Sequence, residues 1–378
     1  MNDDNFDEEY AREAAEEKAE QKRQAEPAPT LSSEEFLAWR SPRKVDQHPT
    51  RLDNPLWHWL VRTRWSAYRA NEIYAGPSPF DAGPMWSFER FGKSETCLPD
   101  GRIVHIGGEH EDHYDPDFHI YNDVTLIGPN GEITILGYPV EDFAPTDFHS
   151  ATLVGNAIFI IGGLVYPEQR VTGATPVYKL MLDSMQIHPA EMYGDPPGWI
   201  YEHSATLAED EQSIIVSGGK QWMGGDLADR ENIDSWSLNT LTGGWHRLTE
   251  HNWQRWTMHR SDRKRSRLWD VRQALWNRNH AHLKLESYWN FDDEPDFAAL
   301  ELLYRLDQDA ATPTQGSSSN VFIVVIDGMK VRFNEEQFWI EAIVEGRLHE
   351  DRLVALQRRT LALLERLEGS ACEIAESE

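Results

Sequence analysis

The feature that most constrains the fold of this chain is a phrase that occurs three times. Four residues, mostly apolar, followed by Gly-Gly stand at 103–108, 158–163 and 214–219. The first glycines of the pairs, Gly107, Gly162 and Gly218, are 55 and then 56 residues apart. A second phrase, His-Ser-Ala-Thr-Leu, occurs at 149–153 and at 203–207 in the same frame. Two independent phrases with one period indicate a repeat architecture.

Each repeat predicts four short strands joined by turns. The first strand carries the His-Ser phrase, and the second is apolar and ends at Gly-Gly. An apolar strand of this kind is expected to be buried on both faces, and Gly-Gly lets a neighbouring backbone approach closely. The third strand carries an aromatic residue. The predicted third and fourth strands lie at 121–124, 176–180 and 235–238, and at 132–136, 185–188 and 244–248.

These features resemble the kelch family, whose repeat of about 50 residues is one four-stranded blade of a β-propeller. The third repeat carries the full set, Gly218, Gly219, Trp236 and Trp245, whereas the first two lack the Trp of the fourth strand. The resemblance covers residues 84–250 and implies a mainly β, kelch-like propeller with three recognisable blades.

Three blades are fewer than the four to eight that close a propeller. An additional strand, expected at 85–91, resembles a fourth strand without its blade. Degenerate blades in the flanks, pairing of two chains as a homodimer, or capping of an open array by the flanks would each complete the structure. Because the flanks look helical, we favour capping first and the homodimer second.

The flanks predict five further segments. A helix is expected to start at Pro55 behind the N-cap Asn54, a hairpin turn at Asp327 and Gly328, and an amphipathic helix over 348–367. The segments are an acidic tail, disordered or helical, at 1–30, a helical N-terminal cap at 31–83, a basic Trp-rich helical segment at 251–311, a linker at 312–320 and a small α+β unit at 321–371.

Composition limits the compartment and the classes of partner. The net charge of −28 argues against nucleic-acid and anionic-membrane partners. Two cysteines, Cys97 and Cys372, cannot form a disulfide framework and are typical of a reducing compartment. No run of apolar residues approaches 18, and the N-terminus does not resemble a signal peptide. We therefore expect a cytoplasmic, soluble protein.

The segment from 251 to 284 has the opposite charge from the rest of the chain. It holds nine Lys or Arg against two Asp, interleaved with Trp253, Trp256, Trp269 and Trp276. Cations and aromatic platforms are the ingredients of a nucleic-acid surface. The acidic total charge instead favours an intramolecular or protein–protein surface, and a merely solvated helix face is the remaining alternative. A helix is expected over 266–286, with Leu268, Val271, Leu275 and Trp276 on one side.

The densest supply of potential ligands is the loop at 109–119, after the first Gly-Gly pair. It holds three histidines and five carboxylates, and imidazole with carboxylate suits a divalent transition metal. The alternative is a polar loop whose side chains cap its own turns. Candidate binding residues here are Glu109, His110, Asp112, His113, Asp115 and His119, with His110, His113 and His119 as candidate metal ligands.

His149 and His203 open equivalent strands of successive repeats. A histidine repeated in frame could line a central channel and bind a ligand, or could form a hydrogen bond that every blade needs. The repetition favours the structural role. Within the kelch family, copper oxidases use a Tyr–Cys pair, but Cys97 has no evident partner tyrosine, so we expect it to be a buried apolar side chain.

Two functions follow from these observations. The first is a non-catalytic protein-interaction scaffold that binds another protein through the loops at 109–119, 164–174 and 220–234. The alternative is a metal-dependent enzyme or ligand-binding protein centred on 109–119. No cofactor is firmly implied, with a divalent metal as the candidate. The first function is favoured because no acid–base or nucleophile arrangement emerges from the repeats.

Overall fold

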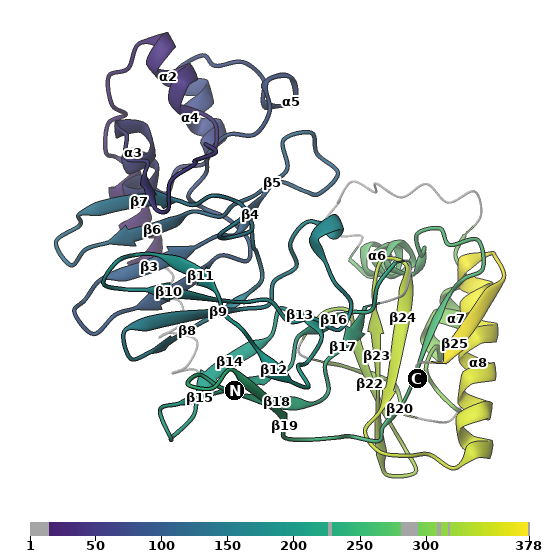
Figure 1. Cartoon of the computed structure of the whole chain (residues 1–378). Helices are drawn as coiled ribbons and strands as arrows, with labels where there is room; N and C mark the ends of the chain where they lie inside the picture. Colours follow the sequence, from purple (N-terminus) through teal and green to yellow (C-terminus); the bar gives the residue numbers. More distant parts are fainter. Residues whose placement is uncertain (1–14, 226–228, 281–293, 308–310, 317, 377–378) are drawn as a thin grey trace. The chain divides into compact units, whose positions relative to one another are not determined.

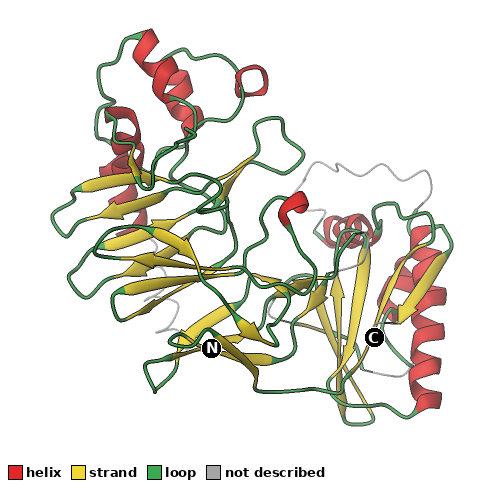
Figure 2. Cartoon of the chain, in the orientation of Figure 1, coloured by secondary structure: helices red, strands yellow, loops and turns green. Residues whose placement is uncertain are grey.

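The computed structural model describes residues 15–225, 229–280, 294–307, 311–316 and 318–376 (Figure 1). The first half of the predicted acidic tail and the end of the predicted helix at 266–286 lie outside these residues. The chain divides into two compact units, Met1–Thr249 and Glu250–Glu378. Strands dominate the described residues, so the predicted mainly β fold is confirmed (Figure 2).

In the first unit, each of the three repeats forms a four-stranded antiparallel sheet, and we number these sheets 1 to 3. Sheet 1 contains β2 (Ser94–Cys97), β3 (Ile103–Ile106), β6 (Val124–Ile127) and β7 (Ile133–Gly137). Sheet 2 contains β8 (Ser150–Val154), β9 (Ala157–Ile161), β10 (Val177–Met181) and β11 (Ile187–Pro189). Sheet 3 contains β14 (Ser204–Leu207), β15 (Ser213–Ser217), β18 (Ser235–Asn239) and β19 (Gly244–Arg247).

Short strands extend these sheets or lie between them. Sheet 1 gains β1 (Thr50–Arg51) beside β7, and sheet 3 gains β12 (Tyr193–Gly194), parallel to β19. The loop after β3 forms a hairpin of β4 (Glu109–His110) and β5 (His119–Ile120). A separate three-stranded sheet contains β13 (Trp199–Tyr201), β16 (Lys220–Trp222) and β17 (Arg230–Glu231), and a 3-10 turn, η1, covers Pro167–Gln169.

Successive sheets share one junction, and the Gly-Gly pairs lie in it. A Cβ added to Gly107 would lie 2.2 Å from the carbonyl oxygen of Thr146, and one added to Gly162 would lie 2.2 Å from that of Ile200. The following glycine of each pair donates its N–H to the same carbonyl, at 2.8 and 2.9 Å. Each pair therefore allows the connection into the next sheet to cross directly over the end of a buried strand.

The histidines of the repeated phrase belong to the same junction. His149 Nε2 is hydrogen-bonded to Ser94 Oγ of sheet 1, and His203 Nε2 to Ser150 Oγ of sheet 2, both at 2.8 Å. Ser150, which takes part in the second of these hydrogen bonds, directly follows His149, which takes part in the first. The His-Ser phrase thus encodes a hydrogen bond between sheets.

Packing between the sheets produces successive apolar layers. Because strand residues alternate between faces, sheet 2 buries one set of side chains against sheet 1 and the other against sheet 3. Sheets 1 and 2 share a core that includes Val104, Ile106, Ile158 and Ile160. Sheets 2 and 3 share a second core. Its buried members are Ala157, Phe159, Ile161, Val177, Ile200, Ile214, Val216, Trp236, Leu238 and Trp245.

The two ends of this stack differ in chemistry. The outer face of sheet 1 is apolar, and the N-terminal helices cover it. The outer face of sheet 3, by alternation, carries polar residues with Ile215 as an exception. These are Ser204, Thr206, Ser213, Ser217, Ser235, Ser237, Asn239 and His246. A polar outer face is typical of the terminal unit of a repeat array.

The N-terminal cap contains α2 (Ser33–Trp39), α3 (Pro55–Thr63), α4 (Ala67–Ile73) and α5 (Pro79–Ala82), after a helix over 15–24. Asn54 accepts a hydrogen bond from Trp57 N at 2.8 Å, as expected of the predicted N-cap. Arg64 ends α3 in the left-handed conformation. Trp57 stacks on Trp86 with 4.5 Å between ring centroids, which joins the cap to the chain entering sheet 1.

The strand expected at 85–91 does not form. These residues make a single β-bridge, from Phe91 to Glu109. Trp86 and Phe88 are buried in the core beneath the helical cap, and Arg90 donates hydrogen bonds to the carbonyls of Ser87 and Gly107. The apolar residues of this segment therefore pack in the core of the N-terminal cap and do not belong to a β-strand.

The second unit is an α+β fold around a six-stranded antiparallel sheet. The strand order is β21 (Thr314–Gln315), β22 (Val321–Ile326), β23 (Met329–Glu335), β24 (Trp339–Val344), β20 (Gln254–Arg260) and β25 (Cys372–Glu376). Its helices are α6 (Leu268–Asn279), α7 (Phe297–Leu302) and α8 (Glu350–Glu368). The helices and one face of the sheet share a single apolar core. The predicted hairpin turn at Asp327 and Gly328 joins β22 to β23.

The second unit begins earlier than the predicted boundary at 321. β20 lies between β24 and β25, so the segment expected to be helical at 251–311 supplies a central strand. Trp256 and Met258 of β20 point into the core, as alternate residues of a strand do. The segment expected as a linker at 312–320 contains β21. None of the described helices is long and apolar enough to cross a membrane.

The junction predicts unequal costs for two matched glycine substitutions. Gly162→Ala should destabilise the protein by about 1–3 kcal/mol more than Gly218→Ala, because its Cβ would meet Ile200 while that of Gly218 has no atom within 4 Å. The backbone strain is shared, since both have a positive φ, of 68° and 65°. Urea unfolding of both variants measures the difference. Equal costs would contradict the role assigned to the junction.

Candidate functional site

The structure places the loop at 109–119 against the N-terminal cap. His110 and His119 are cross-strand partners in the β4–β5 hairpin. The hydroxyl of Tyr68, from α4, donates to Asp117 Oδ2 at 3.1 Å. The loop's turn is held by its own groups, since Tyr114 donates to Asp112 at 2.5 Å and Asp115 N donates to the Asp112 carbonyl at 2.8 Å.

The three candidate metal ligands do not converge. His110 Nδ1 contacts Glu111 Oε1 at 2.8 Å, His119 lies edge-on to Tyr121, and His113 is exposed beside Tyr114. Burial lowers the pKa of both His110 and His119 to about 4. Across the residues that the structure describes, no group of three or more His, Cys, Asp or Glu side chains could hold a metal ion.

The pKa values of two carboxyl groups at the base of this loop, Glu109 and Asp147, are both raised. Burial, and then the charge of and hydrogen bond to Asp147, raise the pKa of Glu109 to about 8, and Asp112 adds to the rise. The pKa of Asp147, which is fully buried, is also raised by burial. Asp147 Oδ1 accepts from Val165 N at 2.7 Å. The interaction of Glu109 with Asp147 therefore links the loop to the connection between sheets 1 and 2.

His149 and His203 are occupied by the sheet junctions. Both are buried, and burial lowers the pKa of His149 to about 3 and that of His203 to about 4. Their imidazoles are therefore neutral and hydrogen-bonded to Ser94 and Ser150. This geometry corresponds to the structural role that the repetition favoured. Cys97, by contrast, is exposed on the edge strand β2, so the expectation that it is buried is wrong.

The basic segment is largely neutralised within the second unit. Six of its arginines have carboxylate partners in the described residues, which are Arg255–Glu341, Arg260–Asp262 and Glu368, Arg263–Glu373, Arg265–Asp270, Arg272–Glu335 and Arg278–Glu294. The partner carboxylates come mostly from strands and helices later in the chain. The local excess of positive charge in the sequence is therefore not an excess in the fold.

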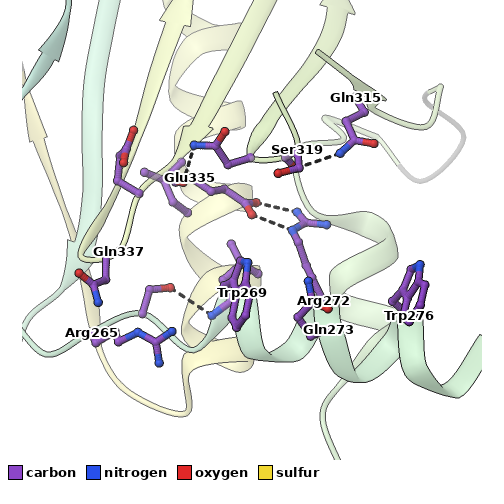
Figure 3. A pocket seen from close by; sticks show the side chains of 14 residues that line it. Arg265, Trp269, Arg272, Gln273, Trp276, Gln315, Ser319, Glu335 and Gln337 are labelled. Atoms are coloured by element: carbon purple, nitrogen blue, oxygen red, sulfur yellow. Dashed lines mark hydrogen bonds and ion pairs between the residues drawn. The ribbon is translucent and has the colours of Figure 1, made fainter. Parts of the chain in front are cut away.

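A cavity of about 660 Å³, missed by the sequence analysis, lies beside this segment within the second unit. We call it the Trp groove because the half-exposed rings of Trp269 and Trp276 stand on its α6 side (Figure 3). It is lined by Arg265, Ser266, Leu268, Trp269, Arg272, Gln273, Trp276, Gln315, Ser319, Asn320, Glu335, Glu336, Gln337 and Ile340.

The register of α6 decides which aromatic residues reach the groove. Leu268 and Val271 are buried in the core, whereas Trp276, predicted on the same side, is 45% exposed. The groove face is rotated by one residue and carries Trp269, Arg272 and Trp276, spaced three and four residues apart as one face of a helix requires. The signal available in the sequence was the spacing of Trp269 and Trp276, which are seven residues apart and so lie on one face of a helix.

Internal contacts hold this face rigid. Arg272 donates two hydrogen bonds to Glu335 at 2.7 and 2.6 Å and lies over the Phe322 ring at 3.8 Å. The hydroxyl of Tyr304 donates to the same carboxylate at 2.6 Å. Trp276 stacks on His280 with 4.3 Å between centroids. The rings and the guanidinium are therefore placed before any ligand arrives.

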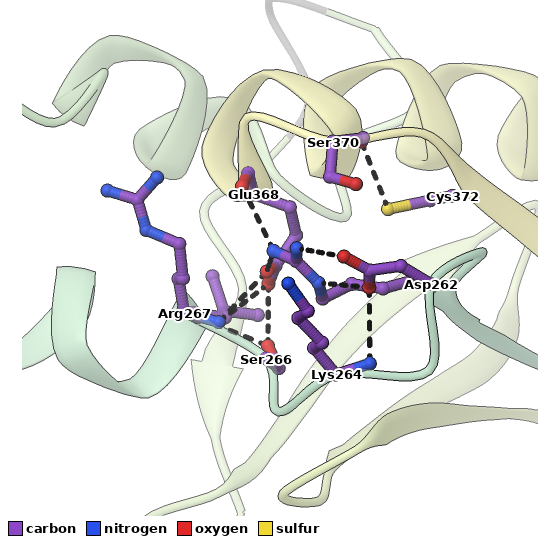
Figure 4. Close-up of polar contacts among 9 residues, drawn as sticks. Asp262, Lys264, Ser266, Arg267, Glu368, Ser370 and Cys372 are labelled. Carbon is purple, nitrogen blue, oxygen red and sulfur yellow. Dashed lines mark hydrogen bonds and ion pairs between the residues drawn. The ribbon is translucent and has the colours of Figure 1, made fainter.

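The start of α6 is anchored by one buried carboxylate. Glu368, the last residue of α8, is 2% exposed. It accepts hydrogen bonds from Ser266 Oγ at 2.6 Å, from Arg267 N at 2.9 Å and from Arg260 at 3.1 Å (Figure 4). An acceptor at unpaired N–H groups is what a helix N-terminus needs. This contact orients the helix that carries both Trp side chains.

The raised pKa of Glu109 predicts a pH dependence of stability. The folded pKa of Glu109, about 8, lies above its ordinary value of 4.5, so the folded state binds more protons between these pH values and stability falls as pH rises through them. Glu109→Gln should flatten the loss of stability between pH 5 and pH 8, measured by urea unfolding. Glu132→Gln is the control, since backbone hydrogen bonding lowers the pKa of Glu132. An unchanged pH dependence in Glu109→Gln would refute the raised pKa of Glu109.

The anchor predicts a large cost for a small change. Glu368→Gln removes the charge that Arg260 and the start of α6 require, and should destabilise the second unit by about 2–3 kcal/mol. Glu301→Gln, on the exposed side of α7, should change stability by less than about 0.5 kcal/mol. Urea unfolding followed by near-UV circular dichroism measures both. Similar values for the two variants would show that Glu368 is not an anchor.

Comparison with known proteins adds little to this geometry. No family model matches the sequence, and no curated protein matches it. Among solved structures, the chain is similar to a novel fungal alcohol oxidase of the AA5 family, in complex with copper, with a TM-score of 0.30 and 16% sequence identity. The match covers 44% of this chain and 45% of the oxidase chain, less than half of its length. A similarity this weak supports no conclusion about fold or activity.

Proposed function

We propose that the protein is a non-catalytic binding protein whose partner docks in the Trp groove of the second unit. The observation that carries the proposal is the pair of tryptophans on α6, 50% and 45% exposed, beside a preformed cavity. Exposing the large apolar ring of Trp to water is unfavourable in free energy. Trp is also among the residues most enriched at binding hot spots. The cavity volume is also within the range of ligand-binding pockets.

The lining favours binding over chemistry. Of its two carboxylates, Glu335 and Glu336, the first is hydrogen-bonded to Arg272 and Tyr304 and is not available as a general base. The residues that line the cavity include no histidine or cysteine. Besides these charged residues and two arginines, the lining offers apolar surface, hydroxyls and side-chain amides, which recognise a ligand without activating it.

The first unit has a supporting role in this proposal. We infer that its sheets are kelch-like blades of an open propeller, capped on one side by the N-terminal helices. The four-stranded units, the Gly-Gly junctions and the polar outer face of sheet 3 support this inference. Its loops, including 109–119, would form a second contact surface for the same or another protein. A cytoplasmic location stays a prediction.

The alternative function, a metal-dependent enzyme at 109–119, has less support. His110 and His119 lie next to each other on the hairpin, but their remaining contacts are aromatic or with Glu111. Nucleic acid is also disfavoured as a partner, because the arginines beside the groove are paired with carboxylates.

A displayed library of random 12-residue peptides tests the proposal on the full chain. Peptides selected on the wild-type protein should bind the double variant Trp269→Ala/Trp276→Ala at least about 10-fold more weakly. They should bind Val354→Ala normally, since this residue is 44% exposed on α8 but does not line the groove. Fluorescence anisotropy measures the affinities. Peptides that bind the double variant as well as the wild type, or no selected peptide at all, would overturn the proposal.

A further inference from the structure

We infer that the segment that binds in the Trp groove is a proline-rich peptide in the polyproline II conformation. The inference rests on the proposed function and adds the chemical class of the partner. Three independent properties of the groove support it, namely the spacing of its aromatic platforms, the absence of unpaired charge among the residues between them, and the kind of hydrogen-bonding groups that line it.

The spacing of the platforms matches one turn of polyproline II. Trp269 and Trp276 are seven residues apart on α6, which places them about 10 Å apart along the helix axis. Polyproline II repeats every three residues, or about 9 Å, so residues i and i+3 of one edge can each meet one ring. A bound β-strand repeats on one side at about 7 or 13 Å and fits the two rings less well.

The two arginines that line the groove are paired with carboxylates without a ligand, and Glu336 adds a further carboxylate to the lining. Arg272, which rises between the two rings (Figure 3), forms a bidentate pair with Glu335. Arg265 pairs with Asp270 at 3.5 Å and lies over the Trp269 ring at 6.0 Å. A phosphate or an acidic peptide would have to break these pairs. The groove therefore suits an uncharged ligand with apolar edges, such as the pyrrolidine rings of proline.

The polar lining suits exposed peptide carbonyls. Polyproline II has no internal hydrogen bonds, so its carbonyl oxygens need donors when water leaves them. Gln273, Gln315 and Gln337 line the groove, and each side-chain amide carries two N–H donors. Gln315 uses a donor on the Ser319 carbonyl, at 3.1 Å, which orients its amide. An α-helical ligand satisfies its own carbonyls and would leave these amides without partners.

The rigidity of both partners favours the same ligand. The groove is held by the Arg272–Glu335 pair and by the stacking of Trp276 on His280. Polyproline II is itself a stiff conformation, so neither side loses much conformational entropy on binding. This is the recognised mode by which aromatic-lined grooves bind proline-rich segments.

The test compares labelled 10-residue peptides that carry prolines three residues apart with matched peptides in which those prolines are alanine. Anisotropy on the full chain should show binding that weakens at least about 10-fold on the Pro→Ala change, and again on Trp269→Ala or Trp276→Ala. Trp276→Phe should retain most of the affinity, because a flat ring remains. Val354→Ala should bind like the wild type.

Other outcomes separate the inference from the proposed function. If the library selects groove-dependent peptides that lack paired prolines, and the proline peptides do not bind, the inference fails while the proposed function stands. A labelled linear β-glucan hexasaccharide gives a further outcome. If it binds in a Trp269-dependent way and no peptide does, the inference and the proposed function both fail, because the Trp rings then stack on sugar rings and not on a peptide. If no peptide and no hexasaccharide binds, both the inference and the proposed function fail as well.

Discussion

The first unit depends on one close approach, in which the connection into each sheet crosses the end of the preceding sheet's buried strand. A carbonyl oxygen lies where the Cβ of Gly107 or Gly162 would be, and that carbonyl receives the N–H of the next glycine. At the same junction, a histidine of the repeated phrase forms a hydrogen bond with a serine of the preceding sheet. Because this contact occurs at both junctions, it positions each sheet against the one before it. The apolar layers between the sheets form as a result.

The second unit depends on contacts that close over long distances in the sequence. Glu368 reaches the start of α6, and Glu335 holds Arg272 in the middle of that helix. In both cases a carboxylate from the second half of the unit neutralises a cation from its beginning. These pairs convert a basic, Trp-rich segment into a neutral rim with two exposed rings. The candidate binding site is therefore a product of the charge pairing that removes the apparent nucleic-acid surface.

Sequence reasoning succeeded where the determinants are local. The hairpin turn at Asp327 and the N-cap at Asn54 depend on a few adjacent residues, and both form as predicted. It failed where a residue's partner is distant. β20 lies in the segment expected to be helical, yet it pairs with two strands whose partner residues are 80 or more positions away. The histidines at 109–119 looked like ligands because proximity in sequence does not reveal which way each ring turns.

The sequence by itself determined the number of repeats, the position of each tight junction and the mainly β class. The repeat period, the positions of the glycines and the alternation of strand residues are properties of the sequence. They can be read without knowing which residues contact one another in the fold. Only the tertiary structure decided which face of α6 is covered, which arginines are neutralised and where a cavity remains. Burial of Leu268 and Val271 turns Trp269 and Trp276 outward, and that rotation depends on core residues from strands and helices far along the chain. The physical reason is that a helix can bury only one face, and the choice of face is made by everything that packs against it.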